Sequence, residues 1–314
     1  LGQPNEEVNP GEILDKVTRI TRLGVGGIGS IDSIPDEARN VQSSHLGYID
    51  PVRTPESLRA GVDVYLAQAA MKGDDGRVYA PFKSIKTGGL VWRSPQQLSK
   101  LVVAFPGEME RRKTRRVGAM RGGKLEFVPR EEVDLVIPNF ENIFSPLAAF
   151  VPGKSGMKAQ RMSMGSRMTT QALGLVNAEA PLVRTGLVDA EGSFEERYAD
   201  KLGAVKTKTG GIVSSITPDY IEVTKDDGTK EKHELYNNYA YNRKSLIHNT
   251  PVVKHHQRVE PGQLLAKSNY TDDKGVSALG VNLRTGYMNY KGLNFEDAVV
   301  ISESAAKKLA SQHM

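Results

Sequence analysis

The sequence contains no cysteine among its 314 residues. This absence excludes a disulfide framework, a thiolate metal site and a cysteine nucleophile. No hydrophobic run approaches the roughly 18 residues that a membrane helix needs, so we expect no membrane partner. The first residues, 1–5, are polar, which predicts that there is no signal peptide. They also lack an initiator methionine, which fits a segment of a longer protein.

Several common site motifs are absent as well. The sequence has no P-loop, no GxSxG elbow and no histidine spacing typical of a zinc site. Its apolar content of 39% is enough to bury a substantial core, and its length suggests about two domains. The net charge of +5 favours a polyanionic partner. The 31 glycines indicate many turns, so we expect a β-rich α+β fold.

Two adjacent acids, Glu296 and Asp297, lie between a turn at Gly292 and the apolar run 298–301. They are interpreted either as solvated acids at an element boundary or as two carboxylates that aim at one cation. The stretch 278–297 resembles the ALGxNxRxxxMxWxGxNFED segment of the β subunit, the second-largest subunit, of multisubunit RNA polymerases. The resemblance implies that both acids lie near the second Mg²⁺, the one that arrives with the nucleotide, with Asp297 closest to a metal role.

The N-terminal stretch, 1–60, resembles the same family. Residues 18–27 are similar to its KRRxSALGPGG segment, and residues 39–56 to its RDVHxxHYGRxCPIETPEG segment. In that family these segments form the fork of the active-site cleft and one wall of the RNA–DNA hybrid site. The resemblance therefore implies that nucleic acid is bound by Arg19, Arg22 and Arg39.

Three positions in this stretch depart from the family pattern. Tyr48 replaces an arginine, Asp50 a cysteine and Arg53 a glutamate, so any role tied to these positions is in doubt.

The same stretch contains a predicted helix. Apolar residues three to four apart predict an amphipathic helix from Glu12 to Arg22.

The segment 158–173 is expected to form a helix that ends before Gly174. Met164 and Met168 lie on one side of this helix, which is typical of a methionine-rich core stripe. Residues 160–172, however, resemble the family's NRALMGANMQRQAV segment. The resemblance implies that Arg161 approaches the triphosphate of the incoming nucleotide, where a guanidinium can bind two phosphate oxygens. Nucleic-acid contacts are likewise implied for Arg167 and Gln171.

The middle of the chain, 61–157, contains short apolar runs divided by glycine-rich breakers and predicts a small antiparallel β module. Its basic run, 111–116, is either a solvated hairpin tip or a phosphate-binding patch. Further along, residues 212–216, 220–224 and 234–236 are predicted strands, with a hairpin turn at 226–228. Together with the resemblance, these strands predict the start of a double-psi β-barrel.

The predicted organisation has four parts: a fork and hybrid-wall region at 1–60, the β module at 61–157, a Met/Arg helix at 158–175 and part of a catalytic-side barrel at 176–314. The resemblance implies templated nucleotidyl transfer from an NTP to an RNA 3′-OH. The resemblance also implies that the primary Mg²⁺ ligands are aspartates of a β′-like largest subunit, in an NADFDGD motif. This chain contains no such motif.

The expected partners are the β′-like subunit, the remaining β segments, template DNA, the RNA transcript and NTPs. We expect the chain to be inactive alone and to reside in the cytoplasm, that of the host cell if the enzyme is phage-encoded. The departures at 48–53 suggest a phage-encoded or otherwise diverged enzyme. The alternative function is a non-catalytic subunit of a transcription complex that binds nucleic acid or acts as a scaffold.

Overall fold

The computed structural model describes residues 6–111, 114–187 and 191–314. The chain divides into two compact units, and each unit consists of segments that are separate in the sequence. Unit 1 comprises Leu1–Ile13, Thr169–Arg184 and Glu195–Met314, and unit 2 comprises Leu14–Met168 and Thr185–Phe194. Within the described ranges, no helix is long and apolar enough to cross a membrane.

Unit 2 is built on a seven-stranded sheet with the order β3-β4-β9-β6-β7-β8, and β5 pairs with β4. Every pair in this sheet is antiparallel except β6–β9, so the sheet is mixed rather than purely antiparallel. Its strands are β3 (Met71–Lys72), β4 (Val78–Ser84), β5 (Leu90–Arg93), β6 (Val102–Ala104), β7 (Arg116–Arg121), β8 (Lys124–Pro129) and β9 (Leu135–Val136).

Small β-branched and alanine side chains form the core of this sheet, because they pack closely on a pleated surface. The cluster consists of Val102, Ala104, Val117, Ala119, Val128, Val133 and Val136. Short helices connect the strands of unit 2: α2 (Asp36–Arg39), α3 (Pro95–Leu98), α4 (Pro146–Ala149), η1 (Ile31–Ser33), η2 (Ser43–His45), η3 (Arg130–Glu132), η4 (Phe140–Ile143) and η5 (Lys154–Gly156).

The helix predicted from Glu12 to Arg22 is shorter than expected. α1 spans Pro10–Thr18, and the next residues form β1 (Arg19–Thr21), which pairs antiparallel with β2 (Asp63–Tyr65). The Thr18 hydroxyl donates to the carbonyls of Leu14 and Asp15 at 3.0 and 3.1 Å, a contact that competes with regular helix geometry. Pairing with a strand more than 40 residues away therefore overrides the local helical pattern.

Unit 1 contains three separate sheets: β10-β18-β16, β13-β12-β11-β17 and β14-β15. In the described part of the chain, none of them closes into a barrel. The strands are β10 (Val205–Lys206), β11 (Gly211–Ile216), β12 (Tyr220–Thr224), β13 (Lys230–Glu234), β14 (Tyr239–Ala240), β15 (Leu246–Ile247), β16 (Asn249–Pro251), β17 (Arg258–Val259) and β18 (Leu264–Ser268). Helices α6 (Phe194–Arg197), η6 (Ala199–Leu202) and α7 (Glu303–Lys308) accompany them.

The predicted hairpin at 226–228 is confirmed. β12 and β13 pair in continuous register from Tyr220 opposite Glu234 to Thr224 opposite Lys230. Gly228 adopts a φ of +80° at the turn, a conformation that glycine accepts without steric cost. Alternating Ile221 and Val223 are fully buried and join a core cluster with residues of β11, β17 and β18.

Candidate functional site

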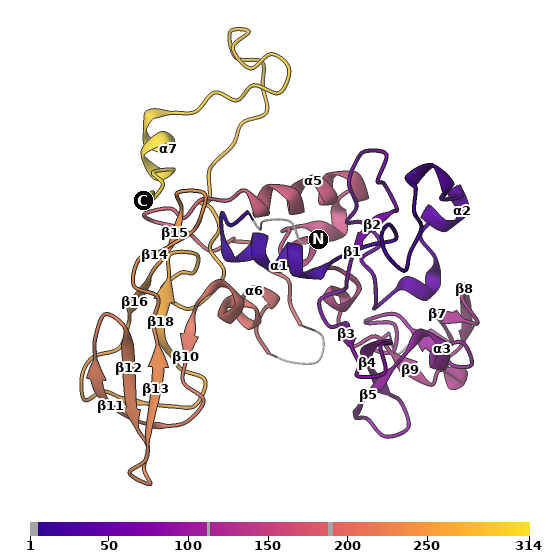
Figure 1. The fold of residues 1–314 in the computed structure, drawn as a ribbon, viewed down its shortest axis with the longest axis horizontal. Coiled ribbons are helices and arrows are strands. Elements are labelled where there is room, and N and C mark those ends of the chain that lie inside the picture. The colour runs from indigo at the N-terminus through magenta and orange to yellow at the C-terminus, as the bar shows by residue number, and fades with distance from the viewer. Residues whose placement is uncertain (1–5, 112–113, 188–190) are drawn as a thin grey trace. The chain divides into compact units, whose positions relative to one another are not determined.

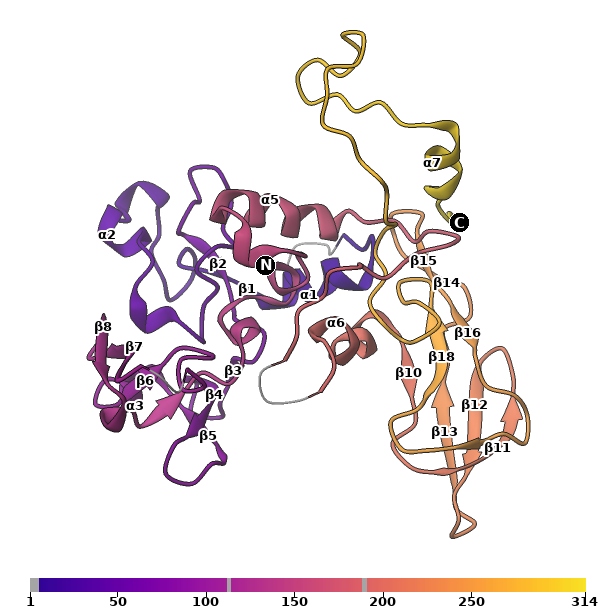
Figure 2. The same ribbon diagram turned by 180° about the vertical axis from the view of Figure 1, so that it is seen from behind.

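The acidic pair lies on a long arm of unit 1. Residues 283–302 contain no helix or strand, and both views show the segment extending away from the sheets as a loop (Figures 1 and 2). Glu296 and Asp297 are exposed in a turn, and Glu296 has a φ of +52°. The Asn294 side chain organises this tip: its Oδ1 accepts from the Tyr290 amide at 2.9 Å, and its Nδ2 donates to the Met288 carbonyl at 2.6 Å.

Both ends of the arm are fastened to the segment 174–182. On the entry side, the Asn282 amide and side chain donate to Glu179 Oε2 at 2.9 and 3.2 Å. On the exit side, Lys308 of α7 forms an ion pair with Glu179 Oε1 at 2.5 Å and donates to the Asn282 carbonyl at 3.1 Å. One carboxylate therefore closes the base of the arm. The hydrogen bond from Lys308, followed by those from Asn282, lowers the pKa of Glu179 to about 2.

This clamp gives a pH prediction. Because the folded pKa of Glu179 lies below the ordinary value of 4.5, the clamp stabilises the arm above that value and is lost as the pH falls towards about 2. In a carboxyl NMR titration, we expect Glu179 to titrate well below the ordinary glutamate pKa of 4.5. Lys308→Met should move the Glu179 midpoint back towards 4.5. An unchanged midpoint in that variant would contradict the clamp.

Arg161 lies on α5, which spans Ala159–Thr170. The interpretation of Met164 and Met168 as a core stripe is wrong. Met168 is 63% exposed, and the helix instead buries a second set of side chains, Met162, Ser163, Ser166 and Thr170. The exposed side carries Arg161 and Arg167, and Gln171 is exposed directly after the helix. The Arg161 guanidinium lies 4.0 Å from Met164 Sδ and forms no ion pair within the described part of the chain.

The predicted site residues fall in both units. Arg161 and Arg167 belong to unit 2, whereas Gln171, Glu296 and Asp297 belong to unit 1. The structure places the two acids together on the arm and the two arginines together on α5. Their joint action at one site therefore stays a prediction.

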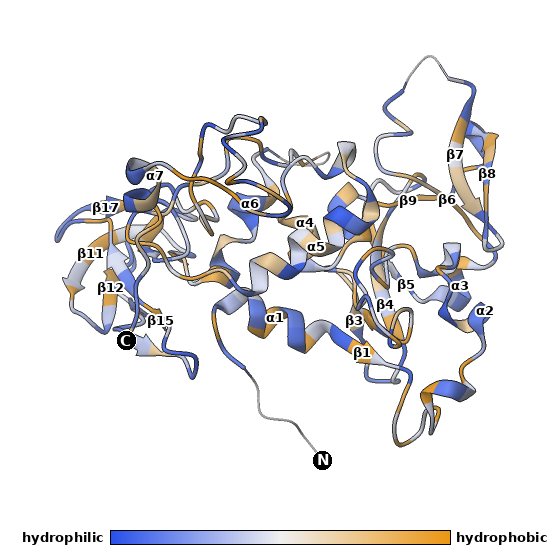
Figure 3. Cartoon of the chain, turned by 90° about the horizontal axis from the view of Figure 1, so that it is seen from above, coloured by the Kyte–Doolittle hydropathy of each residue, from blue (hydrophilic) through white to orange (hydrophobic). Residues whose placement is uncertain are grey.

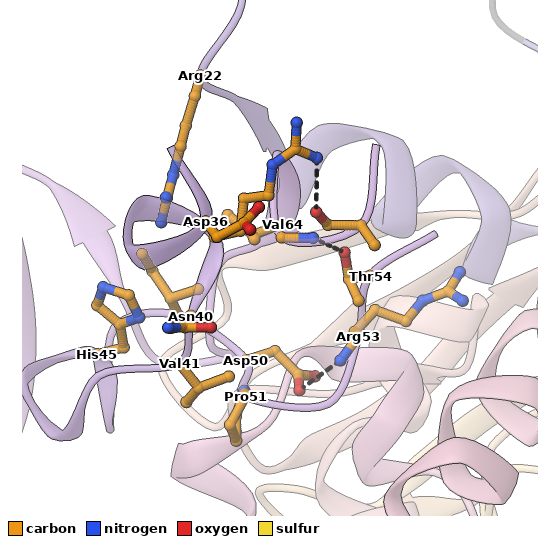
Figure 4. Close-up of a pocket in the computed structure, with 14 residues that line it drawn as sticks. Arg22, Asp36, Asn40, Val41, His45, Asp50, Pro51, Arg53, Thr54 and Val64 are labelled. Carbon is orange, nitrogen blue, oxygen red and sulfur yellow. Dashed lines mark hydrogen bonds between the residues drawn. The ribbon is translucent and has the colours of Figure 1, made fainter. Parts of the chain in front are cut away.

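Of the three N-terminal arginines predicted to bind nucleic acid, two line the same cavity of unit 2. The volume of this cavity is about 490 Å³. Arg22 and Arg39 line it together with His45 and Asp36 (Figure 4). Burial, and then the charge of Arg22, lower the pKa of His45, so its ring is neutral at pH 7. The Arg22 side chain has no ion-pair partner among the residues that the structure describes. It is therefore the cation in this cavity that is available to an anionic group such as a phosphate.

Arg19 and Arg39 make structural contacts. Arg19 forms an ion pair with Asp63, which also contacts Arg59 at 3.3 Å. Burial opposes ionisation of Asp63, but hydrogen bonds from Thr21 and Arg19 hold its pKa below the ordinary value. Arg39 donates to the carbonyls of Ile31 and Leu58 at 3.0 and 2.8 Å and so ties two loops together. Replacing either arginine would therefore also disturb the local structure. A loss of nucleic-acid binding in such a variant would combine this disturbance with the loss of any direct contact.

The three positions that depart from the family pattern are all buried and bonded. Tyr48 donates through its hydroxyl to the Arg93 carbonyl at 2.7 Å. The Asp50 carboxylate accepts from the amides of Val52 and Arg53 at 2.8 and 3.0 Å and of Ser145 at 2.6 Å.

Arg53 points away from the cavity in Figure 4 and forms a buried ion pair with Asp15 at 2.9 Å. Burial raises the pKa of the Asp15 carboxyl, and Arg53 opposes that shift. The Arg53 guanidinium also lies 4.8 Å from the centre of the Tyr65 ring. Sequence reasoning missed Asp15 as a partner, because only the departure at 53 signalled a changed environment.

The basic run 111–116 is only partly described, since residues 112 and 113 lie outside the described ranges. The described residues 111, 114 and 115 lie in the connection between β6 and β7, which pair antiparallel, and Arg116 begins β7. All four are exposed, in agreement with the interpretation as a solvated hairpin connection.

Among the described residues, no group of three or more Asp, Glu or His side chains could hold a metal ion. Glu296 and Asp297 supply two exposed carboxylates, whereas Mg²⁺ needs six oxygen ligands and usually keeps several waters. The pair therefore fits a metal that also brings substrate oxygens or waters, and it does not by itself form a complete binding site.

Two family models match the chain. Residues 206–312 match RNA polymerase Rpb2, domain 6, and residues 3–71 match RNA polymerase Rpb2, domain 3. The chain is 34% identical over 316 aligned positions to the DNA-directed RNA polymerase subunit beta of Thermus aquaticus, covering 98% of the chain and 27% of the relative. The corresponding subunit of Streptomyces avermitilis is 30% identical, with 96% of the chain and 26% of the relative covered. The chain thus spans about a quarter of the length of these relatives.

Proposed function

The chain belongs to the RNA polymerase β-subunit family, and we propose that it supplies part of the active centre of a multisubunit DNA-directed RNA polymerase. The reaction is templated nucleotidyl transfer from an NTP to an RNA 3′-OH. The observation that carries this proposal is the arm 283–302, which displays Glu296 and Asp297 in the open and is fastened at both ends by Glu179. A carboxylate pair held on a fixed loop suits a site that a partner subunit completes.

The exposed apolar side chains of the arm support assembly with a partner. Tyr287, Leu293, Phe295 and Val299 are all largely exposed, and apolar surface of this kind is typical of a protein–protein contact. The partner we propose is a β′-like largest subunit that carries the primary Mg²⁺ ligands. When bound, Mg²⁺ stabilises negative charge on the reacting phosphate. Glu296 and Asp297 would hold the water shell of the second ion.

The remaining roles follow from charge and exposure. Arg161 is exposed on α5 and has no ion-pair partner among the described residues, so its guanidinium is available to bind two oxygens of a triphosphate. Arg22 lines the cavity of unit 2 described above and would contact the nucleic-acid backbone. We further propose that the open sheets of unit 1 are part of a double-psi β-barrel completed by other β segments, and that the chain follows the four-part division 1–60, 61–157, 158–175 and 176–314.

The proposal is tested by replacing Asp297 with asparagine in the polymerase assembled from this chain and its partner subunits. Because the carboxylate acts through the surroundings of a metal ion, we expect nucleotide addition to slow by about 10–100-fold. DNA binding, measured by fluorescence anisotropy, should stay unchanged, and raised Mg²⁺ should recover part of the rate. Asp273→Asn, at an exposed loop residue of the same unit that pairs with Lys267, serves as the matched control.

The competing function is a non-catalytic scaffold that binds nucleic acid. Its net charge of +5 would suffice for such a role. In that case Asp297→Asn would leave nucleotide addition unchanged, or reduce addition and DNA binding by the same factor. Templated synthesis by the isolated chain would overturn the assignment of the primary metal site to a partner subunit.

A further inference from the structure

The strand β8 (Lys124–Pro129) forms one edge of the seven-stranded sheet of unit 2. It pairs with β7 along its whole length, from Lys124 opposite Arg121 to Pro129 opposite Arg116. No strand in the described part of the chain pairs with its other side. An open edge presents backbone donors and acceptors to any extended chain that approaches it.

The hydrogen bonds of Gly118 show which groups of β8 face this open edge. Gly118 lies opposite Phe127, yet its amide donates to Glu108 Oε2 at 3.0 Å and its carbonyl accepts from the Phe105 amide at 3.2 Å. The Gly118–Phe127 pair therefore does not exchange ladder bonds. In an antiparallel ladder bonded and non-bonded pairs alternate, so the backbone groups of Phe127 and Leu125 point to the open edge. The Phe127 carbonyl already accepts a hydrogen bond from the Arg116 guanidinium, which leaves the Phe127 amide and both backbone groups of Leu125 for a ligand.

The side chains of the same two residues are exposed. Leu125 is 59% and Phe127 67% exposed, and they project from one face of the strand because they are two residues apart. Figure 3 shows hydrophobic residues along both strands of the β7–β8 hairpin. Natural edge strands are usually protected by charge or by a covering element. At the middle of this edge, the same two residues, Leu125 and Phe127, present outward-facing backbone groups and exposed apolar side chains.

Positive charge surrounds this edge. In the sequence, residues 111–132 contain eight lysines and arginines against three glutamates. Among the described residues, Arg115 and Arg116 lie at one end of the hairpin, and Arg121 and Lys124 lie at the other. Lys124 and Arg115 have no ion-pair partner in the described ranges. A ligand for this edge therefore needs an extended backbone, apolar side chains at its centre and negative charge around them.

We propose that β8 binds an extended acidic segment of a partner polypeptide as an additional strand of the sheet. Backbone hydrogen bonds to Leu125 and to the Phe127 amide supply affinity, and the exposed side chains of these two residues and the flanking cations select the sequence. A nucleic acid matches these features less well. Its phosphates would pair with the cations, but it has no regular donors and acceptors for the strand edge.

The test is a fluorescence-anisotropy titration of the full chain with a labelled ten-residue peptide of alternating Glu and Val. We expect saturable binding, and no comparable binding of the peptide with Lys in place of Glu. Leu125→Pro removes an amide that faces the open edge while leaving the bonds to β7 intact. It should raise the Kd by at least about fivefold, the equivalent of one hydrogen bond. Leu125→Ser, which tests the side chain alone, should weaken binding in the same direction.

The matched control is Leu58→Ser, which removes a leucine that is 80% exposed outside any strand of the same unit; it should leave the Kd unchanged within about twofold. Circular dichroism establishes that each variant is folded, and Leu125→Ser carries the test if the proline variant is not. The proposal is overturned if the acidic peptide does not bind, or if the control weakens binding equally. It is also overturned if oligo(dT) binds instead and depends on Leu125, or if sedimentation shows that the chain dimerises through this edge.

Discussion

Replacing Asp15 with alanine is expected to lower the free energy of unfolding of unit 2 by about 3–5 kcal/mol. Asp15 and Arg53 are only 8% and 5% exposed in their side chains, so the substitution leaves a guanidinium buried without its counter-ion. The raised pKa of Asp15 indicates that burial outweighs the attraction of Arg53. The pair is therefore a weak net source of stability, and the cost of breaking it arises from the charge that stays behind.

Urea unfolding monitored by the single tryptophan provides the measurement, because Trp92 lies on β5 of the same unit. Asp75→Ala is the matched control. It removes the exposed contacts of Asp75 with Arg77 and Tyr79 and should cost far less than Asp15→Ala. The double variant Asp15→Leu/Arg53→Met removes both charges and should recover most of the loss. If Asp15→Ala costs no more than the control, Arg53 is not held by Asp15 in solution.

The partners of these buried residues could not be predicted from the sequence. The departures at Tyr48, Asp50 and Arg53 were visible as changed letters, but their consequences depend on distant partners. Arg53 meets Asp15 across 38 positions, Tyr48 meets Arg93 across 45, and Asp50 meets Ser145 across 95. A pattern read along the chain carries no information about such contacts. In the structure each of the three residues is buried and hydrogen-bonded to partners that the sequence pattern did not indicate.

Features that depend on residues close together in the sequence were predicted more accurately than contacts between distant residues. The β12–β13 hairpin was predictable because alternating residues and an Asp-Asp-Gly turn both act within a few positions. α1 was predicted too long, because the β1–β2 pairing that ends it is formed with a strand more than 40 residues away. For the site, the motif led to the hypothesis of the acidic pair, which stays a prediction. The clamp at Glu179 was missed, since Glu179 meets Asn282 across 103 positions.

The methionine pattern of α5 led to the wrong buried face for a different reason. Periodicity identifies a stripe, but it does not say whether the stripe faces the core or a ligand. In the structure the helix buries two serines and a threonine beside Met162, and it leaves Met168 exposed. Arg161 is exposed and forms no ion pair within the described ranges, so its proposed contact with the triphosphate can be tested by substitution.

Arg161→Ala in the assembled polymerase is accordingly expected to reduce the rate of nucleotide addition by about 100–1,000-fold, the cost of losing one preorganised charge at the transition state. Arg161 is exposed and forms no ion pair in the part of the chain that the structure describes, so the substitution should not change the stability of the chain. Arg161→Lys keeps the charge but loses the planar fork, and we expect an intermediate rate. The measurement is single-nucleotide addition under rapid quench, with the NTP concentration varied to separate kcat from KM.

Arg167→Ala on the same helix is the discriminating comparison. If Arg167 contacts the nucleic-acid backbone, its loss should weaken the elongation complex and reduce the salt dependence of binding by about one unit of slope, with a smaller effect on rate. Arg161→Ala should show the opposite profile, a slow rate with unchanged complex stability. Identical profiles for the two variants would mean that α5 holds the nucleic acid as a whole and that Arg161 has no separate contact with the triphosphate.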